Sequence, residues 1–261
     1  MNSELHSTFD GSTMVLTIAG PGPVNTLGRA VSAAGVEALN AAETNPEVRA
    51  VVITGQGAHF CAGGNLRQLQ LQVERQQSGT APVQGLDSLH NWVETIRAFP
   101  KPVIAAVEGT AAGGGFSLAL ACDLIVAARN ARFVMSGSRY GLSPQGGGSW
   151  HLARLLPRQL AAELLLAGAA IDAQRLHQLG LVTRLSEASQ ALSAALAWAD
   201  QIGACAPNVL TSLKELIGAA GQHTLHQHLQ LESEHFVRNL QHPNAGIGLA
   251  AFLDKSSPDF E

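Results

Sequence analysis

Three consecutive glycines separate a strand-like run from an apolar stretch of helical length in VEGTAAGGGFSLALACD, residues 107–123. Gly113, Gly114 and Gly115 have no Cβ atom, so the backbone there can approach a ligand closely and adopt positive φ. The first N–H groups of a helix have no partner within it and lie at the positive end of its dipole. Such a helix start can bind a phosphate or stabilise an oxyanion. A tight turn with close helix packing would explain the glycines equally well.

A second glycine-bearing turn favours the oxyanion interpretation. The sequence ITGQGAHFCAGGNLRQL, residues 53–69, leaves an apolar strand-like run and passes through Gly63 and Gly64. Two turns that follow parallel strands can present two backbone N–H groups to one oxygen. Neither turn is a dinucleotide fingerprint, because G-x-G-x-x-G is missing, and neither is a P-loop, because no Gly-Lys-Ser/Thr follows.

Strand and helix signals alternate around these turns. Short apolar runs at 13–20, 48–55 and 101–109 are bounded by Gly or Pro and predict strands, the last two buried on both faces. Apolar residues at helical spacing predict a helix over 27–44. The polar, Gln-rich segment 68–87 is interrupted by Gly and Pro, so we expect a loop there.

Beyond about residue 180 the pattern is helical only. EASQALSAALAWADQIGAC, PNVLTSLKELIGAA, TLHQHLQLESEHFVRNLQH and AGIGLAAFLDK are the four helical segments, and Pro207 falls at a first helical position. Tail helices with two apolar faces commonly pack on neighbouring subunits, so we expect an oligomer.

Composition narrows the class of protein. The chain has 261 residues, and 46% of them are hydrophobic, which is enough for a substantial core. Its net charge is -4. Its 16 Lys and Arg are scattered, so we expect no nucleic-acid partner. The 3 cysteines have no disulfide or metal-ligand spacing and predict reduced thiols. With neither a signal segment nor a membrane-spanning run, we expect a cytoplasmic protein with no membrane partner.

The ordered motifs resemble one known family across nearly the whole chain. They are PVNTLGRA, FCAGGNL, KPVIAAVEGTAAGGGFSLALACDLIVAARNARF, GLSPQGGGSWHLARLLP, AQRLHQLGLV and AFLDKSSPDF. This set resembles the crotonase, or enoyl-CoA hydratase/isomerase, superfamily. The resemblance implies an α/β fold, a spiral of ββα units. It places the core with a CoA-thioester pocket in 1–186 and a helical oligomerisation region in 187–261.

The resemblance also assigns binding roles to particular residues. The oxyanion-hole donors would be the backbone N–H groups of Gly64 and Gly114, which polarise the thioester carbonyl of an acyl-CoA. The CoA path would run past residues at the Gly63–Gly64 turn and the GL-x-P motif, with two further contacts from an adjacent subunit. The four path residues are Ala62, Gly63, Leu66 and Pro144, and the two from the adjacent subunit are Phe252 and Lys255.

The catalytic acids depart from the family's pattern. Hydratases of the family carry one glutamate two residues after the glycine triplet and another before GL-x-P, where this chain has Ser117 and Gly137. Some isomerases and dehalogenases carry an aspartate after that proline, where this chain has Gln145. Neither a hydroxyl nor an amide takes a proton near neutral pH. Hydration by two glutamates is therefore not expected.

Other side chains near these motifs are candidate proton carriers. Asp123 is expected to be structural, because it lies a full helix away from the donors. His59 and His151 are chemically able bases, although a surface or capping role is the simpler interpretation of both. Tyr140 can donate a hydrogen bond but is also explained as a packed aromatic, and Glu108 ranks below the histidines.

Three functions follow from these residues. The first is an isomerase or other lyase of CoA thioesters, with coenzyme A as part of the substrate and no permanently bound cofactor or metal. Loss of CO₂ from a malonyl-type thioester is one example, because it generates the enolate without a base. The second is a catalytically silent acyl-CoA-binding protein. The third is a thioester hydrolase with Ser117 or Cys61 as nucleophile. The resemblance implies a homotrimer or a dimer of trimers.

Overall fold

A six-stranded sheet forms the centre of the computed structural model, which describes residues 3–74 and 80–260. The strand order is β1-β2-β3-β4-β6-β9, with β1 antiparallel to β2 and the other pairs parallel. The strands are β1 (Glu4–Asp10), β2 (Thr13–Ala19), β3 (Ala50–Gly55), β4 (Val103–Val107), β6 (Leu124–Ala128) and β9 (Arg184–Ser186). The strands predicted at 13–20, 48–55 and 101–109 are confirmed.

A second sheet of three short strands adjoins the first. Its order is β5-β7-β8, and its strands are β5 (Thr110–Ala112), β7 (Arg132–Val134) and β8 (Ala170–Asp172). Because β4 and β5 are separated by only Glu108 and Gly109, the chain passes directly from the large sheet into the small one. This passage starts the spiral that the sequence resemblance implied.

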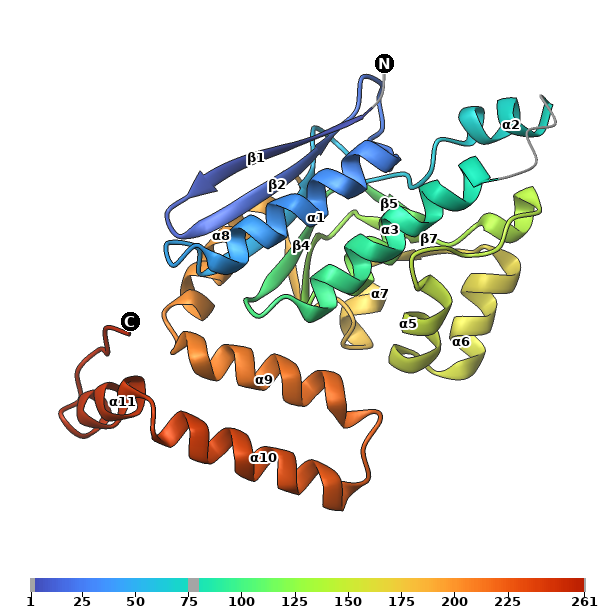
Figure 1. Ribbon diagram of the computed structural model, residues 1–261. Coiled ribbons are helices and arrows are strands. Elements are labelled where there is room, and N and C mark those ends of the chain that lie inside the picture. Colours follow the sequence, from blue (N-terminus) through green and yellow to red (C-terminus); the bar gives the residue numbers. More distant parts are fainter. Residues whose placement is uncertain (1–2, 75–79, 261) are drawn as a thin grey trace.

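Helices cover both faces of the large sheet. In β3 and β4, side chains at alternating positions belong to two separate cores, as the two-residue period of a strand requires. One core lies under α1 (Arg29–Thr44) and α3 (Thr80–Ala98), and the other lies under α8 (Ala191–Gly203). Figure 1 shows α1 and α3 in front of the strands and α8 behind them. The helix predicted over 27–44 is confirmed from Arg29 onward.

The remaining helices surround the small sheet or follow the core. Those near the small sheet are α2 (Leu66–Glu74), α4 (Gly114–Ala121), α5 (Gly148–Leu155), α6 (Arg158–Ala162) and α7 (Ala173–Gln178), with a 3₁₀ turn at Gly137–Tyr140 and a π turn at Glu163–Ala167. After α8 come α9 (Pro207–Ala220), α10 (Leu225–Leu240) and α11 (Pro243–Leu253). Pro207 opens α9 as predicted. Among the helices of the described ranges, none has the length and apolarity to cross a membrane.

The loop predicted over 68–87 is wrong. Residues 68–74 belong to α2 and residues 80–87 to α3, while 75–79 lie outside the described residues. Glutamine is a good helix former, so a Gln-rich segment is compatible with α2. Pro82 falls in the first turn of α3, where the missing N–H removes no helical hydrogen bond. In α2, the polar side chains of Gln68, Gln70 and Glu74 are exposed, so polarity there reflects exposure rather than irregular backbone.

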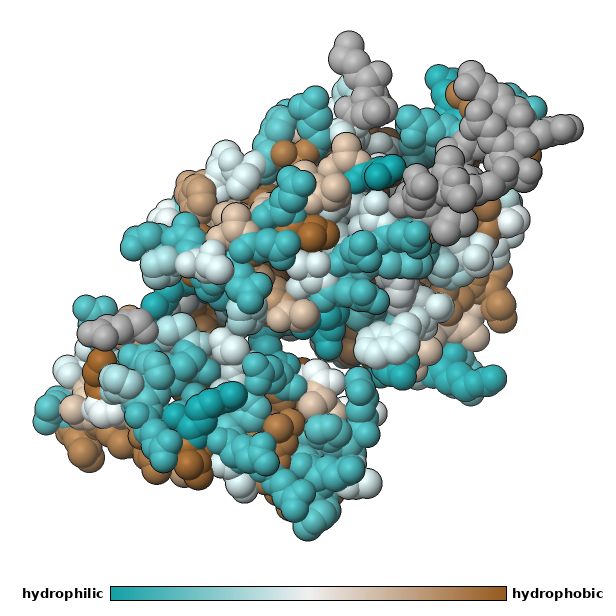
Figure 2. All heavy atoms as spheres, viewed as in Figure 1, coloured by the Kyte–Doolittle hydropathy of each residue, from teal (hydrophilic) through white to brown (hydrophobic). Residues whose placement is uncertain are grey.

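The last three helices expose much of their apolar surface. In Figure 1, α9, α10 and α11 form a layer below the body, and Figure 2 shows brown apolar atoms along the lower left edge in this region. The large exposed apolar residues of these helices are Leu213, Ile217, Leu225, Leu229, Phe236, Val237, Leu240, Leu249, Phe252 and Leu253. So many exposed apolar side chains on three consecutive helices are typical of a protein–protein contact.

Candidate active site

The two glycine turns meet at the ends of neighbouring parallel strands. β3 and β4 pair in parallel, so the segments that follow them emerge at the same edge of the sheet. Cys61 N–H donates to the carbonyl of Thr110 at 3.1 Å, and Ala112 N–H donates back to the carbonyl of Cys61 at 2.8 Å. These bonds fasten the turn after β3 to β5, immediately before the glycine triplet.

Missing Cβ atoms allow this close approach. A Cβ at Gly63 would lie 2.7 Å from the Ala112 oxygen and 2.8 Å from the Gly114 nitrogen, and one at Gly115 would overlap the carbonyl of Cys61. Gly113 has φ 50, which a side chain would strain, and it precedes the first residue of α4. A side chain is therefore disfavoured at each of these three glycines for a different cause. The missing Cβ atoms allow the two turns to pack closely and leave the backbone open to a ligand.

Two backbone N–H groups at this junction remain available. Gly114 is the first residue of α4, so its N–H has no partner within the helix. Leu27 pairs with the Gly63–Gly64 turn through its own N–H, which donates to the Gly63 carbonyl at 2.8 Å. Within residues 3–74 and 80–260, neither Gly64 N–H nor Gly114 N–H donates a hydrogen bond to the protein. An oxygen placed between the two turns could accept from both.

Ser117 is a buried structural hydroxyl. Its exposed fraction is 0%, and its Oγ donates to the carbonyl of Gln145 at 2.6 Å. Space for Ser117 comes partly from Gly148, where a Cβ would lie 2.6 Å from that Oγ. The hydroxyl therefore ties α4 to the segment that enters α5, and a longer side chain would displace one of these elements.

Gly137 occupies a position that is closed to side chains. It begins the 3₁₀ turn, and a Cβ there would lie 2.6 Å from the carbonyl oxygen of Leu142. Leu142 N–H also donates to the Gly137 carbonyl at 2.9 Å, which holds the two backbones together. A glutamate at this position would require the backbone to move, so the difference from the family's pattern extends beyond one side chain.

Two carboxylates singled out in the sequence have structural partners. Asp123 accepts from the N–H of Val103 at 2.8 Å and from Nζ of Lys214 at 2.5 Å, which agrees with its predicted structural role. Glu108 accepts from the N–H groups of Ser189 and Ala191 at 3.1 and 2.7 Å. It thus caps the start of α8, where the helix dipole favours a negative charge.

The two histidines considered as bases differ in environment. Nδ1 of His59 accepts from the N–H of Thr110 at 3.2 Å, at the start of β5, so this ring nitrogen has a structural partner. His151 is 5% exposed on α5, and burial together with the charges of Arg97 and Arg154 lowers its pKa to about 4. It is therefore neutral at pH 7. Tyr140 is 57% exposed, so it is not the packed aromatic that the sequence suggested.

The two nucleophiles considered for hydrolysis are poorly placed. Ser117 uses its hydroxyl hydrogen on the Gln145 carbonyl, and no histidine forms a hydrogen bond with it among the described residues. Burial raises the pKa of the Cys61 thiol to about 12, so little thiolate forms at neutral pH. Neither residue has an activating base, and the geometry disfavours a thioester hydrolase.

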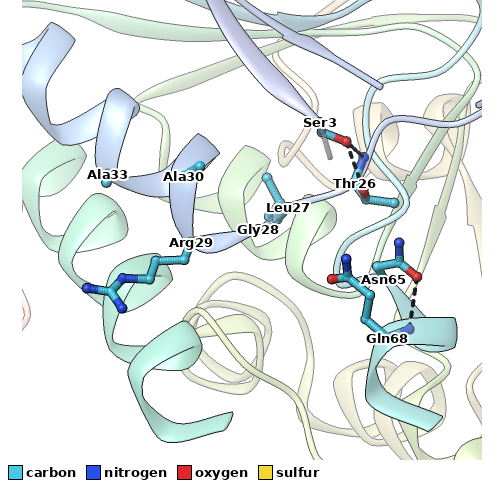
Figure 3. Close-up of a pocket in the computed structure, with 9 residues that line it drawn as sticks. All are labelled: Ser3, Thr26, Leu27, Gly28, Arg29, Ala30, Ala33, Asn65 and Gln68. Carbon is cyan, nitrogen blue, oxygen red and sulfur yellow. Dashed lines mark hydrogen bonds between the residues drawn. The ribbon is translucent and has the colours of Figure 1, made fainter. Parts of the chain in front are cut away.

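A cavity of ≈ 460 Å³ opens beside the Gly63–Gly64 turn. Figure 3 shows it between the start of α1 and the start of α2, with Asn65 and Gln68 on one side and Leu27 and Gly28 on the other. Its lining residues are Ser3, Thr26, Leu27, Gly28, Arg29, Ala30, Ala33, Asn65 and Gln68. The sequence had pointed instead to Ala62, Gly63 and Leu66 in the same turn. The residues Leu27 to Ala30 belong to the motif PVNTLGRA, which is the sequence signal for this wall of the cavity.

The predicted CoA contacts fall at both ends of the molecule. Leu66 begins α2 and is 50% exposed, and Pro144 is an exposed residue of the segment before Gln145. Phe252, 80% exposed near the end of α11, and Lys255 just beyond it lie far from α2 in Figure 1. Within one chain these last two residues do not reach the glycine turns, and a neighbouring subunit would have to supply them.

Comparison with known proteins defines the class. The structure matches a crystal structure described as an enoyl-CoA hydratase from Polaromonas sp. JS666 with a TM-score of 0.96 and 58% identity, covering 99% of this chain and 100% of that chain. The 1,2-epoxyphenylacetyl-CoA isomerase of Escherichia coli K12 is 34% identical over 97% of both chains. The 2,3-dehydroadipyl-CoA hydratase of the same strain is 32% identical over 99% of both.

The profile of the enoyl-CoA hydratase/isomerase family matches residues 8–261. The chain belongs to this family, and its fold is the crotonase fold implied by the sequence motifs. The relatives include both an isomerase and hydratases, so membership alone leaves the reaction open.

Proposed function

We propose that this protein is an isomerase or another lyase of acyl-CoA thioesters, and not a two-glutamate hydratase. The thioester carbonyl binds between the N–H groups of Gly64 and Gly114, which stabilise the enolate oxygen as negative charge forms on it. The names of the relatives support the acyl-CoA substrate class. The adenosine and pantetheine parts of CoA follow the cavity beside Asn65 and Gln68.

One observation supports this reaction class above the others: the two unpaired N–H groups lie beside the Gln145 side chain and one helical turn from Ser117, and neither residue carries a carboxylate. Ser117 is engaged with the Gln145 carbonyl, and Gly137 has no room for a side chain. A reaction that forms the enolate with little help from a base fits such a site, whereas double-bond migration would need a histidine to move the proton. When a malonyl-type thioester loses CO₂, the electrons of the broken C–C bond move onto the thioester oxygen, and water then protonates the carbon.

A panel of CoA esters tests the proposal. The purified protein is incubated separately with crotonyl-CoA, a β,γ-enoyl-CoA and a malonyl-type CoA ester, and products are followed by chromatography. Turnover of the second or third ester without hydration of the first is expected. Hydration of crotonyl-CoA by the wild-type protein would overturn it. Tight binding of all three without turnover would favour the catalytically silent acyl-CoA-binding alternative, which the closed Gly137 position also supports.

We further propose a homotrimer or a dimer of trimers, in which Phe252 and Lys255 of one subunit approach the CoA bound to the next. The exposed apolar surface of α9, α10 and α11 supports this arrangement. Light scattering after size exclusion should give the mass of three or six chains, and a monomer at micromolar concentration would contradict it. The cytoplasmic location stays a prediction.

A further inference from the structure

Gln145 reaches the candidate oxyanion site from a backbone that is held in place. Its carbonyl accepts from the Oγ of Ser117 at 2.6 Å, which anchors it to α4. Gly146 and Gly147 follow with φ values of 66 and 76, a conformation that favours glycine, and α5 begins at Gly148. The chain therefore turns sharply just after Gln145, and the Gln145 backbone is fixed on both sides.

The side-chain amide of Gln145 lies next to both predicted donors. Its Nε2 is 3.3 Å from the position that a Cβ of Gly64 would take and 3.4 Å from the corresponding position at Gly114. The other two nearest groups at the Gly114 position are methyl groups of Leu27 and Leu89. One nitrogen atom thus approaches two glycines that are 50 residues apart in the sequence.

This amide is not used by the protein itself. Within the described parts of the chain, no hydrogen bond is formed by the amide of Gln145, and the residue is partly exposed. Leu27 and Leu89, whose methyl groups share the Gly114 position with the amide, are 8% and 3% exposed, so this side of the site is apolar. A hydrogen bond to a charged ligand atom is stronger in such a place than in water.

We propose that the Gln145 amide is a third hydrogen-bond donor to the thioester oxygen, beside the N–H groups of Gly64 and Gly114, and that Ser117 is the residue that positions it. The inference rests on the proposed function, because it assumes an acyl-CoA in this site. An amide N–H stabilises an oxyanion, whereas a carboxylate at the same position would repel it. Two positions that hold acids in relatives of the family would thus cooperate in electrostatic stabilisation.

The test uses cinnamoyl-CoA, whose conjugated thioester absorbs at longer wavelength when its carbonyl is polarised. Wild-type protein is expected to bind it and shift its absorption maximum to the red. Gln145→Met has nearly the same length and shape but no donor, and should bind with a smaller shift. With any CoA ester that the wild-type protein converts, kcat/KM of this variant should fall by about 10- to 100-fold. Gln159→Met, at an exposed position on α6, is the matched control and should behave as wild type.

Two further variants separate donation from packing. Gln145→Glu keeps the shape and replaces the donor with a carboxylate, so its red shift should be smaller than that of Gln145→Met. Ser117→Ala frees the Gln145 carbonyl and should give a shift between those of wild type and Gln145→Met. Circular dichroism checks that each variant is folded.

The outcomes distinguish the two proposals. A red shift that is equal in wild type and in both Gln145 variants would overturn the third donor and leave the two-donor site intact. Binding without any shift in the wild type would overturn the oxyanion site and the third donor together, and so would failure to bind. A shift that falls in the expected order supports both.

Discussion

The two sides of the candidate site are constructed from different groups. On the oxyanion side, Gly63–Gly64 and Gly113–Gly115, the backbone of one turn packs on the backbone of the other because Cβ atoms are missing. The acid side consists of Ser117, Gly137 and Gln145, and none of them carries an acid. A hydrogen bond joins the Ser117 hydroxyl to the Gln145 carbonyl, and the Leu142 carbonyl leaves no room for a side chain at Gly137. The site for an oxygen can therefore persist while the groups that move protons change.

The largest effect is expected on the oxyanion side, from Gly115→Ala. The new Cβ would overlap the Cys61 carbonyl, which belongs to the backbone and cannot rotate away. We expect a loss of several kcal/mol in the free energy of unfolding, or an insoluble protein, from overpacking and disrupted strand contacts. Urea denaturation measures it. Gly218→Ala in α9, which meets open space, is the matched control and should be neutral or stabilising by up to about 1 kcal/mol.

A smaller change at the same side should separate activity from folding. At Gly114 a Cβ would lie 3.2 Å from a methyl group of Leu89, which can shift slightly, so Gly114→Ala should fold. It crowds the oxygen site and should lower kcat/KM by about 10²- to 10³-fold, as expected for a lost oxyanion donor. Turnover equal to that of wild type would show that this side does not bind the thioester oxygen.

On the acid side, restoring the missing acids should fail. Ser117→Glu together with Gly137→Glu should produce no crotonyl-CoA hydration and should lower the free energy of unfolding. Ser117 is 0% exposed and the Leu142 carbonyl closes position 137. Hydration assays and urea melts measure both effects. Hydratase activity in the double variant would mean that the two sides differ only in side-chain identity.

The smallest effect is expected at His151, the neutral histidine of α5, the helix that follows Gln145. The pKa of His151 is about 4 in the folded protein, against an ordinary value of 6.5. Between these values the unfolded chain binds a proton that the folded chain does not, so stability falls as pH drops from 6.5 to 4. His151→Gln should weaken this decline. The free energy of unfolding of each protein is measured across this pH range and compared with its own value at pH 8. Identical pH profiles for the two proteins would show that His151 is not buried as a neutral group.

Much of the fold was predictable because its signals are local. Apolar runs bounded by Gly and Pro predicted β3 and β4, and the helical period predicted α1 and the last four helices. The failure over 68–87 came from treating polarity as a sign of loop, although an exposed helix such as α2 is polar too. The cap that Glu108 forms on α8 was also invisible, because its partners lie 81 and 83 residues away.

By itself, the sequence determined the order of the elements, the family resemblance and the two glycines expected to donate to an oxygen. These depend on residue type and spacing, which are read along the chain. Only the tertiary structure decided that Gly115 must pack on Cys61, that a carbonyl closes position 137, and that Gln145 lies against both Gly64 and Gly114. The physical reason is that each of these facts is a distance between segments far apart in sequence, and such distances are set when the sheets and helices pack.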